Sequence, residues 1–163
     1  MDTRWLDTGE QAAWVRLAAV LELLPAALDA QLRRDAQLTH FDYYVLAMLS
    51  EAPGRTLRMT ALAERTTATL ARLSHVVQRL EARGLLERFP CPEDRRATNA
   101  RLTAAGWAKV QQSAPGHVAT VREYVIGALT GEQVAQLGQI ADAVLHRLDP
   151  DGARSAIYQR YDR

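Results

Sequence analysis

Arginine is concentrated in one internal stretch of the chain. Residues 55–101 contain ten Arg and five acidic side chains, while the whole chain of 163 residues has a formal net charge of only +1. The rest of the sequence is therefore mildly acidic. Such a separation of charge indicates a face that binds a polyanion.

Part of this stretch, residues 69–83, has the pattern of an amphipathic helix. Leu73, Val76, Val77 and Leu80 follow helical spacing and predict a buried stripe. The opposite face is small and polar, and arginines line one flank of it. Such a face suits the major groove of DNA, because Ser, Gln and His can bond base edges and Arg can reach guanine or phosphate. The candidate DNA-contacting residues are Thr69, Ala71, Arg72, Ser74, His75, Gln78 and Arg79. The alternative is the solvated face of an ordinary surface helix.

The loop at residues 90–96 is a second basic element. Its flanks, residues 85–89 and 98–102, have the pattern of two strands, so the loop is expected at the tip of a hairpin. Arg95 and Arg96 could enter a minor groove, and Asp94 could hold the turn in shape by accepting hydrogen bonds. The alternative is a solvated turn with ion pairs of little value.

The surrounding elements form a winged helix-turn-helix lobe over residues 39–102. Thr39 is predicted to cap one helix, and Pro53-Gly54 to end it. A short helix capped by Thr60, a tight turn near residues 66–68 and the helix 69–83 precede the hairpin. The fold class is therefore mainly α, a three-helix core with a β-hairpin wing.

Long amphipathic helices flank the lobe within a single domain, 1–163. Residues 10–36 and 103–148 carry more apolar surface than a small lobe can bury, so we expect both to pair with a second copy of the chain. A kink or break is expected at Pro25, and the first helix after the hairpin is expected to run to about Leu129, bent near Pro115. Residues 151–163 form a polar tail, expected to be ordered only where it docks.

Four segments together resemble the multiple-antibiotic-resistance regulator (MarR) family. The combination of Arg-Leu-Glu-x-x-Gly-Leu with Asp-x-Arg and Leu-Thr-x-x-Gly, in this order and separation, is a strong joint signal. The resemblance extends from about Trp14 to Leu148. The segments are Leu62–Arg65, Val77–Arg88, Pro92–Arg96 and Leu102–Gly106.

The resemblance implies a homodimeric transcription factor, a repressor, that binds pseudo-palindromic promoter DNA. Asp94 and Arg96 match the family's wing Asp-x-Arg. Arg72 and His75 fall where the family often places polar or basic contact residues. Double-stranded DNA and a second copy of the chain are the implied partners.

Many members of the family lose DNA affinity when a small aromatic or phenolic anion binds between the dimer helices and the DNA-binding lobe. The candidate residues here are Trp14, Arg16, His40, Tyr43 and Tyr44. Aromatic residues on dimer helices are more often interface core, so both interpretations stay open.

Other function classes have less support in the sequence. A winged-helix module that recruits a protein would need the helix arginines paired with acids, but Arg72 and Arg79 have few acidic partners at i±4.

The single cysteine, Cys91, excludes an internal disulfide. Some relatives sense peroxide through a thiol, but that thiol lies nearer the N-terminus than Cys91 does. No nucleophile–base spacing, metal-ligand cluster or phosphate loop suggests an enzyme, a cofactor or a metal. No apolar run approaches the roughly 20 residues of a membrane span, and no signal peptide is apparent, so a cytoplasmic protein is expected.

Overall fold

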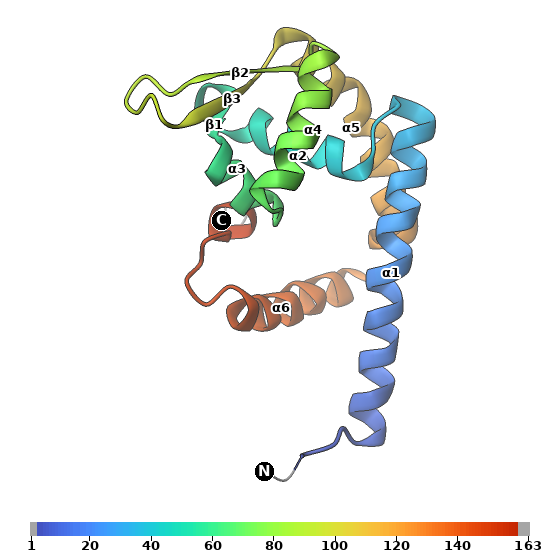
Figure 1. Ribbon diagram of the computed structural model, residues 1–163. Helices are drawn as coiled ribbons and strands as arrows, with labels where there is room; N and C mark the ends of the chain where they lie inside the picture. The colour runs from blue at the N-terminus through green and yellow to red at the C-terminus, as the bar shows by residue number, and fades with distance from the viewer. Residues whose placement is uncertain (1–2, 160–163) are drawn as a thin grey trace.

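The computed structural model describes residues 3–159 as a mostly helical chain around a small sheet (Figure 1). The elements are α1 (Thr8–Ala36), α2 (His40–Glu51), the 3₁₀ turn η1 (Pro53–Arg55), β1 (Thr56–Arg58), α3 (Met59–Thr66), α4 (Leu70–Ala82), β2 (Leu86–Pro90), β3 (Thr98–Leu102), α5 (Ala104–Tyr124), the 3₁₀ turn η2 (Ile126–Ala128), α6 (Gly131–Leu148) and α7 (Ser155–Tyr158). The predicted fold class, a mainly α winged helix-turn-helix, is confirmed.

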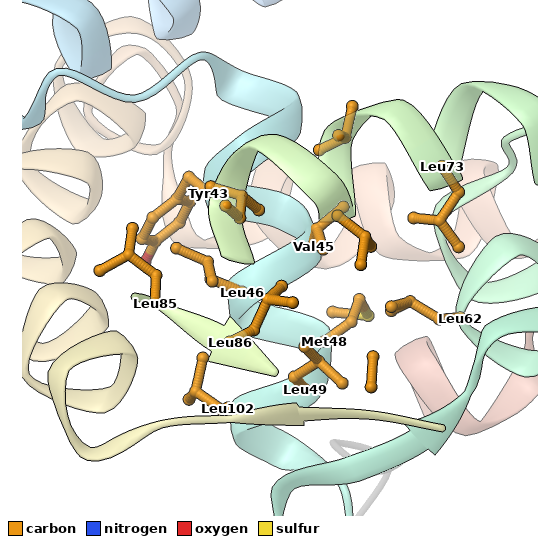
Figure 2. Packing of buried hydrophobic residues seen from close by; sticks show 14 of the residues in the cluster. Tyr43, Val45, Leu46, Met48, Leu49, Leu62, Leu73, Leu85, Leu86 and Leu102 are labelled. Carbon is orange, nitrogen blue, oxygen red and sulfur yellow. The ribbon is translucent and has the colours of Figure 1, made fainter. Parts of the chain in front are cut away.

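The core of the lobe lies between α2, α3, α4 and the sheet. Leu46 and Leu49 of α2 are fully buried and meet Leu62 of α3 and Leu73 of α4 (Figure 2). Burying a leucine of this kind contributes about 1.5–3 kcal/mol. The shared apolar contacts therefore fix the angle between α3 and α4, which a helix-turn-helix requires.

The wing is the hairpin of β2 and β3, and β3 is the central strand of an antiparallel sheet in the order β1-β3-β2. Leu86 pairs with Leu102 at the base of the hairpin, and Pro90 pairs with Thr98 near its tip. On the other edge, Thr56 of β1 pairs with Arg101. Both leucines at the base point into the core, so the hairpin is anchored at one end and its tip projects beyond the lobe (Figure 1).

Only the C-terminal part of α1 is packed within the chain. Leu28 and Leu32 are buried, and this half of the helix lies beside α5, whereas Trp14, Leu17 and Leu21 are exposed. The remainder of α1 extends away from the lobe, and α6 turns back beneath it (Figure 1). Large apolar residues are exposed on α6 as well, namely Leu137, Ile140, Val144 and Leu148.

The length and composition of α1 correct one expectation from the sequence. One 18-residue window of this helix has a mean hydropathy of 1.3 and few charges, so the helix is long and apolar enough to span a membrane. This property is weak evidence for a membrane, because a helix whose apolar face is covered by a partner protein has the same composition. Arg16, Glu22 and Asp29 interrupt the apolar residues of this helix, so no unbroken apolar run of that length occurs in the sequence.

Several predicted boundaries also need correction. Of the kink or break expected at Pro25, the break is wrong, because α1 continues through this residue. A proline leaves the carbonyl four residues earlier without its helical donor, and Leu21 is exposed there, so water can satisfy it. The helix α3 begins at Met59, with Arg58 rather than Thr60 at its cap. The helix after the wing ends at Tyr124 and not at Leu129.

The segment after α6 docks onto α3. The Asp149 carboxylate accepts hydrogen bonds from the backbone N–H groups of Ala153 and Arg154 and from the Tyr158 hydroxyl. The Arg154 guanidinium donates to the carbonyl of Glu64 at 3.1 Å. Part of the predicted polar tail is thus tied down in the described chain, and its last residues, 160–163, lie outside the described residues.

Candidate nucleic-acid interface

The helix α4 is held rigidly at both ends. The Thr69 hydroxyl caps its first turn by accepting from the Arg72 N–H at 3.2 Å. Gly84 follows the last turn at φ +71°, a left-handed conformation that glycine adopts without strain. The predicted buried stripe of Leu73, Val76, Val77 and Leu80 is confirmed. The side chains on its opposite face are therefore presented at fixed positions.

The outward face of α4 is small and polar. Ala71, His75 and Gln78 are exposed, and Ser74 is partly covered. Within residues 3–159, no side-chain hydrogen bond or ion pair involves His75 or Gln78. Both side chains therefore keep their donors and acceptors available for a ligand such as base edges.

The three arginines on one flank of α4 lean against α2 and the turn before it. The Arg72 guanidinium lies 4.2 Å from the centre of the Phe41 ring, and Arg83 donates to the Gln37 carbonyl at 3.0 Å. Arg79 forms an ion pair with Asp42, whose side chain is only 3% exposed. The lack of acidic partners at i±4 therefore does not leave Arg79 unpaired, because its partner lies 37 residues away in the sequence.

The tip of the wing is built around Asp94. Its carboxylate accepts from the Arg96 N–H at 3.1 Å and lies 3.6 Å from the Arg96 Nε. The Arg96 side chain is 96% exposed, and Arg95 beside it is exposed as well. Asp94 thus shapes the turn, and the two guanidinium groups face solvent, as a wing that enters a groove requires.

A basic hollow of about 220 Å³ separates the wing from α4. Ser74 and Leu70 of α4 form one wall, and Arg58, Arg88 and Arg96 contribute three positive charges. Arg88 is fixed there by Glu81, whose carboxylate accepts a hydrogen bond from Arg88 Nη2 at 2.9 Å. The hydrogen bonds from Arg88 lower the pKa of Glu81. Arg58 and Arg88 were not among the DNA-contacting residues predicted from the sequence. The one feature of the sequence that could have indicated both residues is their position in the arginine-rich stretch, residues 55–101.

Cys91 is a structural residue at the base of the wing tip. Its thiol is 1% exposed and donates to the Glu93 carboxylate at 3.1 Å, and this hydrogen bond lowers the pKa of Glu93. The Arg58 guanidinium lies 3.5 Å from the sulfur on the other side. The thiol therefore links β1 to the wing.

The proposed ligand residues fall into three separate places in one chain. His40 and Tyr43 lie around His117 of α5, with ring centres 6.2 Å and 4.7 Å from the His117 ring. Burial lowers the pKa values of both histidines and raises that of Tyr43. Tyr44 points elsewhere and donates to the Arg65 carbonyl at 3.1 Å. Trp14 and Arg16 lie on the exposed part of α1, about 20–22 Å along the helix from Asp29, which contacts His40.

A rigid helix with free polar groups, beside a basic wing, defines a winged helix-turn-helix DNA-binding protein. Comparison with known proteins identifies the group within this class. A sequence model of the MarR family matches residues 36–97. The regulator HosA of Escherichia coli O111:H- is 34% identical over 96 residues, which cover 59% of this chain and 69% of HosA. The chain belongs to the MarR family.

Two further relatives extend the comparison. The crystal structure of Sco3205 from Streptomyces coelicolor, a MarR family regulator in complex with DNA, is 44% identical with a TM-score of 0.87 and covers 91% of this chain and 93% of its own. The transcriptional repressor YetL of Bacillus subtilis is 26% identical over 113 residues, 64% of this chain and 68% of YetL. The protein is accordingly a DNA-binding transcriptional regulator and not an enzyme, and the partners of such a regulator are double-stranded DNA and a second copy of the chain.

Proposed function

We propose that this regulator is a repressor that binds an inverted repeat in promoter DNA and is released by a small aromatic or phenolic anion. In each half-site, α4 lies in the major groove and the wing tip lies in the adjacent minor groove. The unpaired polar face of α4 next to the exposed Arg95 and Arg96 side chains of the wing is the observation that carries this proposal. The similarity to YetL, which is named a repressor, supports the sign of regulation.

The apolar faces of α1 and α6 supply the dimer contact in this proposal. Leu21 and Ile140 are 58% and 62% exposed, and neighbouring large apolar residues are exposed along the same two helices. A face of this size is costly in water and is typical of an interface. In this proposal, the dimer formed through these helices presents two copies of α4 to a symmetric operator.

The effector would act at the junction of α1, α2 and α5. His40, Tyr43 and His117 supply aromatic surface there, and the buried Nδ1 of His117 and Oε1 of Gln31 have no partner within the described residues. A phenolic carboxylate could use such groups. Because the junction connects the long helices to the lobe, a ligand there could change the spacing of the two lobes.

Selection of randomised duplex DNA by the purified full-length protein tests the proposal. We expect enrichment of an inverted repeat with half-sites about one helical turn apart. Adding 4-hydroxybenzoate at constant ionic strength should then lower the affinity for the selected operator. A pool without a common motif, at low salt where non-specific binding persists, would favour a protein-recruiting module instead.

A further inference from the structure

A second basic hollow lies on the flank of α4 that faces away from the wing. It is lined by Arg33 and Gln37 at the end of α1, by Thr39 and Asp42 at the start of α2, and by Arg79 and Arg83, and it encloses about 330 Å³. The wing-side hollow contains Leu70 and Ser74 of the same helix. At 100° per residue, these two residues and the pair Arg79 and Arg83 lie on opposite sides of α4.

The charges in this second hollow are not balanced. The one carboxylate in its lining, Asp42, is already used: it accepts from the Thr39 N–H at 2.9 Å and is paired with Arg79. Among residues 3–159, Arg83 donates only to a backbone carbonyl, that of Gln37, and no carboxylate there compensates its positive charge. Arg33 is paired with Asp29 but is exposed, with its side chain 62% accessible. The hollow therefore has a fixed wall, Arg79 with Asp42, and two accessible guanidinium groups.

The geometry of DNA gives this arrangement a ligand. A helix in the major groove has one phosphate backbone on each side, and phosphate contacts set the register of the protein on the duplex. The wing-side hollow faces one backbone, so the hollow on the opposite side of α4 faces the other. A phosphate diester matches a pair of guanidinium groups in both charge and hydrogen-bond geometry.

We propose that the hollow between the α1–α2 turn and α4 binds a DNA backbone phosphate on the side of the major groove away from the wing. Arg83 and Arg33 are the phosphate ligands, and the Asp42–Arg79 pair is the positioning wall. This inference rests on the proposed docking of α4 in the major groove. It assigns to Arg79 a role in orienting the helix and not in reading a base.

The salt dependence of operator binding tests this site in the full-length dimer. Arg83→Gln should weaken binding and make the plot of log K against log salt concentration less steep by about 0.9 per lost phosphate contact. Arg33→Gln should do the same, and Arg83→Lys, which keeps the charge, should retain most of the slope. The selected DNA motif should stay unchanged in each variant, because a phosphate contact carries no base information.

Two controls separate this inference from the proposed function. Arg34→Gln removes a charge one residue away that is paired with Asp35 and does not line the hollow, so its slope should equal that of the wild type. Arg96→Ala should lower the slope through the wing. A reduced slope for Arg96→Ala with an unchanged slope for Arg83→Gln and Arg33→Gln would overturn the phosphate site while leaving the function intact. If the wild type selects no motif, the proposed function fails first and the site fails with it.

Discussion

At the scale of single residues, the interface divides into side chains that are held and side chains that are free. Asp42 closes the capping box of α2 and also holds Arg79, and Asp94 holds the turn of the wing. His75 and Gln78 have no such partner within the described chain. A held side chain can position the helix, whereas a free one can exchange its water for a base. We therefore expect His75 and Gln78, and not the held side chains, to read bases.

We expect His75→Ala and Gln78→Ala each to relax base preference at one position per half-site. A good bidentate contact to a base is worth about 1–3 kcal/mol of discrimination, and both side chains point outward from α4. Repeating the selection from randomised DNA with each variant measures this loss directly. The salt slope should not change. A uniform fall in affinity with the motif retained would show that these side chains contact only the backbone.

The residues that the sequence could not place are those whose partners are distant along the chain. Helical spacing identified the outward face of α4 and the arginines on its flank, and the wing Asp-x-Arg pattern identified Asp94 and Arg96. The pairing of Arg79 with Asp42 spans 37 residues and depends on how α2 and α4 pack. The stacking of Arg72 on Phe41 has the same origin. Tertiary packing, and not local pattern, decides which arginines are free.

At the scale of elements, local signals predicted most of the chain. Side-chain caps at Thr39, Thr69, Thr103 and Thr130 start four helices, and the cap at Thr39 was predicted. The strand β1 and the helix α7 were not predicted, because three or four residues are too few to show a period. Both are held by contacts from elsewhere, β1 by β3 and α7 by the Asp149 carboxylate.

The contact between α5 and the wing base depends on Gly106. A Cβ added at this position would lie 1.9 Å from the carbonyl oxygen of Leu85 and 2.7 Å from a methyl group of Leu102. The start of α5 is fixed at this point, because Thr103 donates to the Gly84 carbonyl at 2.6 Å. No side chain can be accommodated unless the helix moves away from the hairpin.

We expect Gly106→Ala to destabilise the protein by about 1–3 kcal/mol, the range found for overpacked sites. This loss should exceed the gain of about 0.5–1 kcal/mol that alanine brings to a helix. Denaturant unfolding at a fixed protein concentration measures the net change in the free energy of unfolding. Gly138→Ala is the matched control, because Gly138 also lies within a helix and has open space around it, so this variant should be neutral or stabilised. Equal behaviour of the two variants would contradict the close approach.

At the scale of the whole molecule, the lobe has a buried apolar core of its own, whereas the long helices leave apolar side chains exposed. The lobe buries its apolar residues within one chain, whereas no residue of α6 is buried and half of α1 is exposed. A single chain could keep its wing and α4 in shape, but its long helices would expose large apolar side chains to water. In the proposed dimer, we therefore expect the pairing of the long helices to set the distance between the two copies of α4.

Ile140→Asp should separate the two chains. Ile140 is in the middle of the exposed apolar stripe of α6, and burial of an isoleucine is worth about 1.5–3 kcal/mol. Symmetry places the change twice in the dimer, so we expect a loss of about 3–6 kcal/mol, at least roughly a hundred-fold in the dimer dissociation constant. Light scattering after size-exclusion chromatography measures the change in oligomeric state.

Gln139→Asp adds the same charge on the other side of α6 and should stay dimeric. If Ile140→Asp also stays dimeric, α6 is not part of the interface. If it becomes monomeric, it should bind the full operator no better than a single half-site, because only the pairing of the long helices presents both copies of α4 together.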